Sequence, residues 1–203
     1  MTDAPQIYLV TPPDVDSAFA VRLAAVLDAH PVACLRLALA TRDTDRITRA
    51  ADLCREVAHR FDVPLVIAEH ATLVEPLGLD GVHLADPRSV RRLRAEWGPD
   101  PIIGAFCGTS RHDGMLAGEA GADYVSFGPV GGPASSSGTL AEPGLFAWWS
   151  EMIELPVVAE GGFDETGMIA IREVTDFVAL GEEVWSAPEP AARLVDLVAA
   201  LTR

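Results

Sequence analysis

A (β/α)8 TIM barrel is the fold class that the sequence predicts, and three observations lead to it. Short apolar runs alternate with longer segments of helical periodicity along all 203 residues. The apolar runs are continuous, as expected for parallel strands that are buried on both faces. Eight strand and helix units can be assigned, which favours a closed barrel over its rival, a doubly wound open sheet. No flexible linker or change in composition divides the chain, so we expect a single domain over residues 1–203.

The strands are assigned to short runs rich in β-branched and apolar residues. In chain order they cover residues 7–10, 32–37, 64–67, 81–84, 102–106, 123–127, 156–159 and 176–180. The helices are assigned from apolar residues at helical spacing, such as Val15, Phe19 and Leu23 in the first. Pro87 suits a first helical turn and Gly121 suits a helix end. The predicted helices cover residues 14–29, 45–61, 71–77, 87–97, 110–120, 143–153, 164–173 and 190–202.

The composition excludes several classes of partner. The formal net charge is −15, and no lysine occurs among the 15 basic residues other than histidine. An acidic surface repels nucleic acid and anionic lipid, so we expect neither as a partner. No apolar run reaches the ~20 residues of a membrane span and no signal peptide is evident, so a cytoplasmic location is expected. The cysteines, Cys34, Cys54 and Cys107, lie far apart and are expected to be buried and unpaired.

Glycine-rich segments follow the last three predicted strands, where barrels place their functional loops. Bare backbone N–H groups in such loops suit a phosphate, and we expect one to be bound there. A pair of glycine turns that bind nothing is the alternative, and Glu160, Glu182 and Glu183 oppose an anion at this place. The predicted binding residues are Gly128, Ser135, Ser136 and Ser137 after the sixth strand, Gly161 and Gly162 after the seventh, and Gly181 after the eighth.

Charged residues end the second, third and fourth strands. Arg36, between Leu35 and Leu37, either clamps a pyrophosphate at the barrel mouth or belongs to an ion pair in the bottom layer of the barrel or at an interface. Glu69 and Asp86 are candidate ligands for Mg²⁺, which prefers one or two carboxylates together with substrate phosphates. His83, inside an apolar strand, is interpreted as a hydrogen-bonded core residue.

The order of these segments resembles the family of thiamine phosphate synthase and its relative, thiazole tautomerase. The matching segments, spread over nearly the whole chain, are IYLVT (7–11), VPLVI (63–67), GVHL (81–84), GADYVSFGPV (121–130), PVVAEGG (156–162) and APEP (187–190). The resemblance implies a TIM barrel that couples an aminopyrimidine pyrophosphate to a thiazole phosphate and expels pyrophosphate, with Mg²⁺ as cofactor. The tautomerase activity is less expected, because no histidine ends the fifth or sixth strand.

The resemblance assigns catalytic roles to Arg36, Glu69 and His70. The family's Gln-Leu-Arg-Lys of strand 2 falls on residues 34–37, Cys-Leu-Arg-Leu, and its Asn-Asp-Arg of strand 3 falls on residues 68–70, Ala-Glu-His. The Thr-x-Thr-Lys of the strand-6 loop is replaced by serines, and the Val-Ser of the strand-8 loop by two glutamates. These departures predict a degraded active site.

Three hypotheses about function therefore remain open. The chain makes thiamine phosphate with a modified site, acts on another small phosphorylated or heteroaromatic compound, or is a non-catalytic ligand-binding barrel. The sequence also leaves the oligomeric state open, because Trp148 and Trp149 fit either a homo-oligomer interface or a half-buried helix face.

Overall fold

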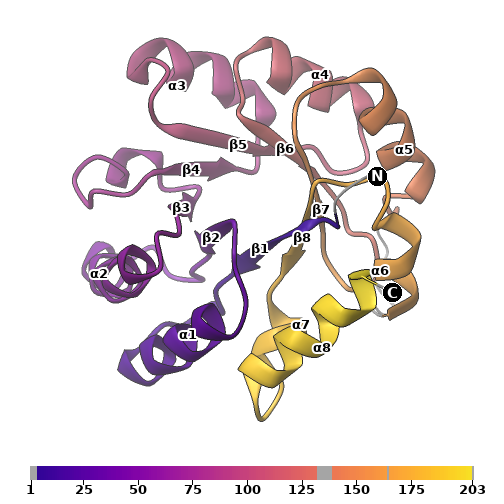
Figure 1. Cartoon of the computed structure of the whole chain (residues 1–203). Coiled ribbons are helices and arrows are strands. Elements are labelled where there is room, and N and C mark those ends of the chain that lie inside the picture. Colours follow the sequence, from indigo (N-terminus) through magenta and orange to yellow (C-terminus); the bar gives the residue numbers. More distant parts are fainter. Residues whose placement is uncertain (1–3, 132–138, 164, 203) are drawn as a thin grey trace.

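The protein forms a closed barrel of eight parallel strands in sequence order, surrounded by helices (Figure 1). This computed structural model describes residues 4–131, 139–163 and 165–202. Strand β1 pairs with both β2 and β8, which closes the sheet and confirms the barrel over an open sheet. The strands are β1 (Gln6–Val10), β2 (Cys34–Leu37), β3 (Leu65–Ala68), β4 (Gly81–Leu84), β5 (Ile102–Phe106), β6 (Tyr124–Phe127), β7 (Val157–Glu160) and β8 (Phe177–Leu180).

The helices follow the predicted order with two differences. They are α1 (Ser17–Ala29), α2 (Thr44–Arg60), α3 (Val90–Trp97), α4 (Arg111–Glu119), α5 (Pro143–Met152), α6 (Glu165–Ile171), α7 (Glu182–Trp185) and α8 (Pro190–Thr202), with 3₁₀ turns η1 (Ala71–Leu73) and η2 (Pro87–Ser89). The predicted helix over 71–77 is wrong, because only η1 forms there. Pro76 lacks an N–H and disfavours helical backbone at the residue before it. The second difference is α7, a short helix between β8 and α8 that the sequence pattern did not indicate.

Aromatic side chains fill the inside of the barrel. The hydroxyl oxygens of Tyr8 and Tyr124 lie 2.7 Å apart, and Nδ1 of His83 lies 3.0 Å from the Tyr124 hydroxyl. His83 is therefore the buried, hydrogen-bonded core histidine that we predicted. Gly104 makes room for this cluster, since a Cβ there would lie 2.0 Å from the Tyr124 ring. The barrel is thus a packed core and not a pore.

Three aspartates organise the N-terminal end of the barrel, which we call the floor. Asp80, Asp123 and Asp176 directly precede β4, β6 and β8. Each carboxylate accepts a hydrogen bond from an N–H at the start of the preceding strand. The donors are Leu65 (2.6 Å) and Val157 (2.8 Å), which begin β3 and β7, and Ile103 (2.7 Å), the second residue of β5. The bonds fix where neighbouring strands begin relative to each other.

The three cysteines and Trp149 are buried in the core, whereas Trp148 is only half-buried. Cys34, Cys54 and Cys107 are buried and free, as predicted, and burial raises the pKa of each thiol to about 12. Trp149 is buried in the core, whereas Trp148 is half-buried beneath the guanidinium of Arg111, 4.6 Å from its ring centroid. Within the described ranges, no helix is both long and apolar enough to cross a membrane.

Candidate active site

An ion pair spans the C-terminal end of the barrel, which we call the mouth. Arg36, on β2, points inward and its Nη1 lies 2.9 Å from Oε2 of Glu160, at the end of β7. The guanidinium carbon also lies 5.6 Å from the centroid of the Tyr8 ring. Burial is the largest single influence on the pKa of Arg36 and lowers it, but Glu160, Tyr8 and Tyr124 together outweigh burial, so the pKa is raised. Arg36 therefore lies at the mouth, and its ion pair is with Glu160 at that end and not in the bottom layer. The contact with a pyrophosphate stays a prediction.

Two buried polar groups at this end of the barrel have no partner. Nε of Arg36 and Oγ of Ser126 are both buried without a hydrogen bond within the part of the chain that the structure describes. Ser126 lies two residues beyond Tyr124 on β6 and shares its inward direction. Buried donors without partners are costly and rare in folded proteins, so they mark places where a ligand atom or water is expected. The mouth thus offers two groups that can donate to a ligand, one on Arg36 and one on Ser126.

Glu69, His70 and Asp86 lie on neighbouring loops of the mouth. Glu69 follows β3 with a left-handed backbone (φ 66°), a conformation that costs an L-residue about 1–2 kcal/mol. Its Oε1 accepts a hydrogen bond from the Ala85 N–H, in the loop after β4. Asp86 accepts one from the N–H of Arg88 and begins η2. The half-buried His70 begins η1, and among the described residues its imidazole has no hydrogen-bond partner.

The two carboxylates therefore come from adjacent strand ends, as the sequence predicts, but each already binds a backbone N–H. The described residues contain no cluster of three or more His, Cys, Asp or Glu side chains that could hold a metal ion. Two carboxylates still fit Mg²⁺ if substrate phosphates and waters complete its octahedral shell.

The glycines after β6 and β7 pack the two loops together. A Cβ on Gly128 would lie 2.3 Å from the carbonyl oxygen of Glu160, and one on Gly131 would lie 2.2 Å from that of Gly162. Gly161 and Gly162 both have left-handed backbone, with φ of 88° and 73°. These glycines are thus needed for close backbone contact between the loops, whether or not an anion binds there.

The loops after β7 and β8 are joined by a side chain of the protein itself. Glu183, on α7, accepts hydrogen bonds from the N–H of Phe163 to Oε1 (3.1 Å) and from the N–H of Gly181 to Oε2 (3.0 Å). These donors come from the loops where we predicted phosphate binding by Gly162 and Gly181. A carboxylate therefore occupies two backbone N–H groups of the predicted phosphate site.

Sequence reasoning found some of these residues and missed the roles of others. Glu160 and Glu183 were noted as obstacles to an anion, but not as partners of Arg36 and of the loop amides. Ser126 was missed, although its inward direction follows from its alternation with Tyr124 along β6. The predicted binding residues Ser135, Ser136 and Ser137 lie outside the described residues.

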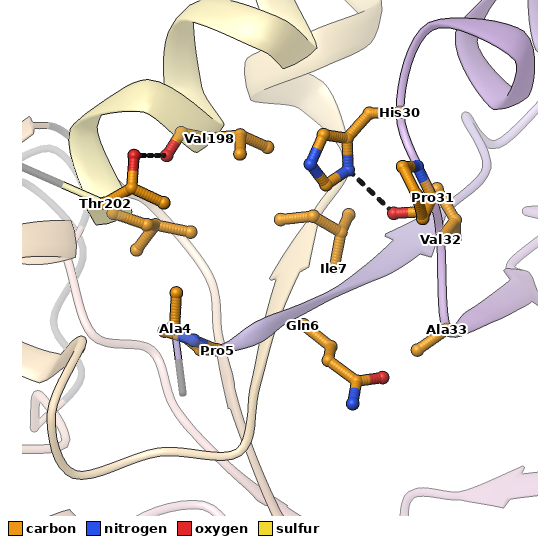
Figure 2. A pocket seen from close by; sticks show the side chains of 11 residues that line it. Ala4, Pro5, Gln6, Ile7, His30, Pro31, Val32, Ala33, Val198 and Thr202 are labelled. Atoms are coloured by element: carbon orange, nitrogen blue, oxygen red, sulfur yellow. Dashed lines mark hydrogen bonds between the residues drawn. The ribbon is translucent and has the colours of Figure 1, made fainter. Parts of the chain in front are cut away.

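A separate cavity lies at the floor, away from these residues. Its volume is about 280 Å³, and it lies between the start of β1, the end of α1 and the end of α8 (Figure 2). Figure 2 shows His30 beside it, with Nδ1 2.7 Å from the Pro31 carbonyl oxygen. Barrel enzymes work at the opposite end, so the candidate active site is the mouth.

The closed barrel defines a (β/α)8-barrel protein, and its charged residues lie at the end where barrel enzymes carry their active sites. The family model described as thiamine monophosphate synthase matches residues 7–184. A thiamine-phosphate synthase from Rhodospirillum centenum (strain ATCC 51521 / SW) is 41% identical over 203 aligned residues, covering 97% of each chain. A second, from Erythrobacter litoralis (strain HTCC2594), is 36% identical and covers 92% of this chain and 91% of its own. The chain therefore belongs to the thiamine monophosphate synthase family.

A solved structure shows the same fold. The thiamine phosphate pyrophosphorylase from Pyrococcus furiosus has a TM-score of 0.81 to this chain at 20% identity, covering 98% of this chain and 97% of its own. The fold expectation drawn from the family resemblance is thus confirmed.

Proposed function

We propose that this protein couples an aminopyrimidine pyrophosphate to a thiazole phosphate, giving thiamine phosphate and pyrophosphate. The observation that carries the proposal is the 41% identity, over 97% of both chains, to a protein named thiamine-phosphate synthase. Arg36 and the two buried groups without partners at the mouth, among the described residues, support the proposal. Small phosphorylated molecules are then the substrates, and a cytoplasmic location agrees with that role.

The reaction breaks one bond and forms another. The C–O bond between the pyrimidine methylene and the pyrophosphate breaks, and its electron pair leaves with the pyrophosphate. The thiazole nitrogen then gives its lone pair to the methylene carbon. Negative charge grows on the leaving oxygen, so fixed donors near that oxygen accelerate the step.

Arg36 is the residue proposed to meet that charge. It is held between Glu160 and the Tyr8 ring, and its buried Nε has no partner within the described chain. The planar guanidinium can bind a phosphate with two N–H groups while Nη1 keeps Glu160. The hydroxyl of Ser126 is a further donor for the same substrate.

Mg²⁺ is the proposed cofactor, and Glu69 and Asp86 would hold it. When bound, it would neutralise charge on the leaving pyrophosphate. His70 is adjacent to Glu69 and is proposed to contact the same substrate. The thiazole phosphate is assigned to the loops after β6, β7 and β8, with Gly128, Ser135, Ser136, Ser137, Gly161, Gly162 and Gly181 as its proposed contacts.

The test is to incubate the purified protein with both phosphorylated substrates and Mg²⁺, and to follow pyrophosphate and thiamine phosphate together. We expect the two products in equal amounts, and no release of pyrophosphate without the thiazole. Chelation of Mg²⁺ is expected to stop the reaction. Absence of product with intact substrate binding would contradict the proposal and favour a non-catalytic binding barrel.

A further inference from the structure

The Glu183 carboxylate is placed as a bound anion would be. Its two oxygens each accept one backbone N–H, from Phe163 and from Gly181, and these donors belong to different loops of the mouth. Barrels commonly bind a phosphate between the loops after strands 7 and 8, beside a short extra helix. Here α7 is that short helix, and it brings a carboxylate to the same loops.

The position of Glu183 is fixed by the residues that follow it. Val184 is fully buried, and Nε1 of Trp185 donates a hydrogen bond to the Val10 carbonyl oxygen (2.6 Å). The Trp185 ring also packs edge-on against Phe19, with centroids 4.8 Å apart. The carboxylate therefore points at the two loop amides from a helix that is anchored to β1 and α1.

A phosphate cannot use these two amides while Glu183 holds them. Two anions at the same donors repel each other, so the phosphate must displace the carboxylate or bind without these amides. An uncharged hydroxyl at the same place meets no such repulsion, and it can donate a hydrogen bond to the carboxylate. The chain thus has its own negative charge at a subsite that a phosphorylated substrate would otherwise fill.

We propose that Glu183 is a specificity-determining residue that makes this mouth favour a thiazole alcohol over the corresponding thiazole phosphate. The proposal rests on the proposed function, because it concerns the acceptor of that same coupling reaction. Thiamine phosphate still forms from the phosphorylated acceptor, but less efficiently than thiamine forms from the alcohol.

A capping role alone would explain one of the two bonds. A glutamate in the first turn of a helix often accepts a hydrogen bond from the N-cap N–H, here that of Gly181. It would not explain the bond from Phe163, which lies 20 residues away in the loop after β7. Loss of a helix cap would change stability but would not create a phosphate site. The experiment therefore measures the binding of phosphate.

The first measurement is calorimetric titration of inorganic phosphate into the wild type, E183Q and E182Q. Glu183→Gln is nearly isosteric and removes the charge, whereas Glu182→Gln removes the same charge from an exposed neighbour on α7. We expect phosphate binding by E183Q and none by the wild type or E182Q. Glu183→Ala is the second variant, and phosphate should raise its Tm. Equal behaviour of all variants, or no phosphate binding by folded E183Q and E183A, overturns the proposal.

The second measurement is the ratio of kcat/KM for the thiazole alcohol to that for the thiazole phosphate. We expect the ratio to exceed one in the wild type and to fall about tenfold or more in E183Q, equivalent to about 1.4 kcal/mol. An unchanged ratio contradicts the proposal. If no variant releases pyrophosphate, the proposed function fails, while the titration still decides whether Glu183 excludes phosphate.

Discussion

Carboxylates accept hydrogen bonds from backbone N–H groups at both ends of this barrel, but the donors belong to strands at one end and to loops at the other. At the floor, Asp80, Asp123 and Asp176 each bind the start of a neighbouring strand. At the mouth, Glu69 and Glu183 bind amides of loops that follow the strands. A ligand has no reason to replace the floor bonds, because barrel substrates bind at the other end. The bonds of Glu183 occupy two N–H donors that a substrate anion would use, and the bond of Glu69 occupies a carboxylate oxygen that a metal ion would use.

We therefore assign the floor carboxylates to stability and the charged residues of the mouth to function. A floor carboxylate should matter for the free energy of unfolding and leave activity unchanged. A charge at the mouth should matter for substrate binding and turnover. The following substitutions test that division, in order of decreasing effect.

Arg36→Met should lower kcat/KM for the pyrimidine substrate by about 100- to 1,000-fold, the usual effect of removing one donor to a developing negative charge. The expected loss follows from the place of Arg36 in the mouth, against Tyr8 and Glu160. Steady-state pyrophosphate release measures it.

The same substitution leaves Glu160 without its partner, so R36M/E160Q serves as a second variant that restores charge balance. It should regain stability and stay inactive. Full activity in either variant would show that Arg36 does not stabilise the charge on the leaving pyrophosphate.

Asp176→Ala should lower the free energy of unfolding by about 1.5 kcal/mol, the value of a hydrogen bond to a charged group. It removes the acceptor of the Val157 N–H at the start of β7. Urea unfolding measures the change, with D176N as a control that keeps one acceptor oxygen. An unfolding midpoint equal to that of the wild type, or a large fall in kcat/KM, would contradict the assignment of the floor to stability.

His83 should make stability depend on pH. Burial, with a smaller contribution from Arg36, lowers its pKa well below the usual 6.5. Below pH 6.5 the unfolded chain therefore binds a proton that the folded protein does not, and stability falls as the pH falls. The slope for one proton is about 1.4 kcal/mol per pH unit.

The measurement is the urea unfolding free energy between pH 6.5 and 5.5, compared with that of H83Q. The slope for H83Q should be smaller than that of the wild type, by roughly half a proton at pH 6.5 and roughly nine-tenths of a proton at pH 5.5. H59Q, which replaces an exposed histidine on α2, should keep the wild-type slope. Parallel curves for the wild type and H83Q would refute a buried, neutral His83.

The sequence predicted the barrel because strand and helix periods alternate regularly along the chain. It also predicted that Glu69 and Asp86 lie at the mouth, since these residues directly follow strands β3 and β4. The predicted helix over residues 71–77 does not form, because Pro76 interrupts the helical spacing there. The sequence could not predict that Glu183 reaches Phe163, because that contact depends on α7, a helix of four residues. The sequence pattern around Arg36 also does not show its ion pair with Glu160, because the two residues lie 124 positions apart.

The most direct test of this account compares inorganic phosphate as a stabiliser of E183A and D176A. Both variants lose a carboxylate that accepts a backbone N–H, one at the mouth and one at the floor. A ligand at 100 times its Kd stabilises a protein by about 2.7 kcal/mol, which corresponds to a rise in Tm of roughly 5–10 °C for a chain of this size. We predict that rise for E183A and none for D176A. An equal response of the two variants to phosphate would contradict the account.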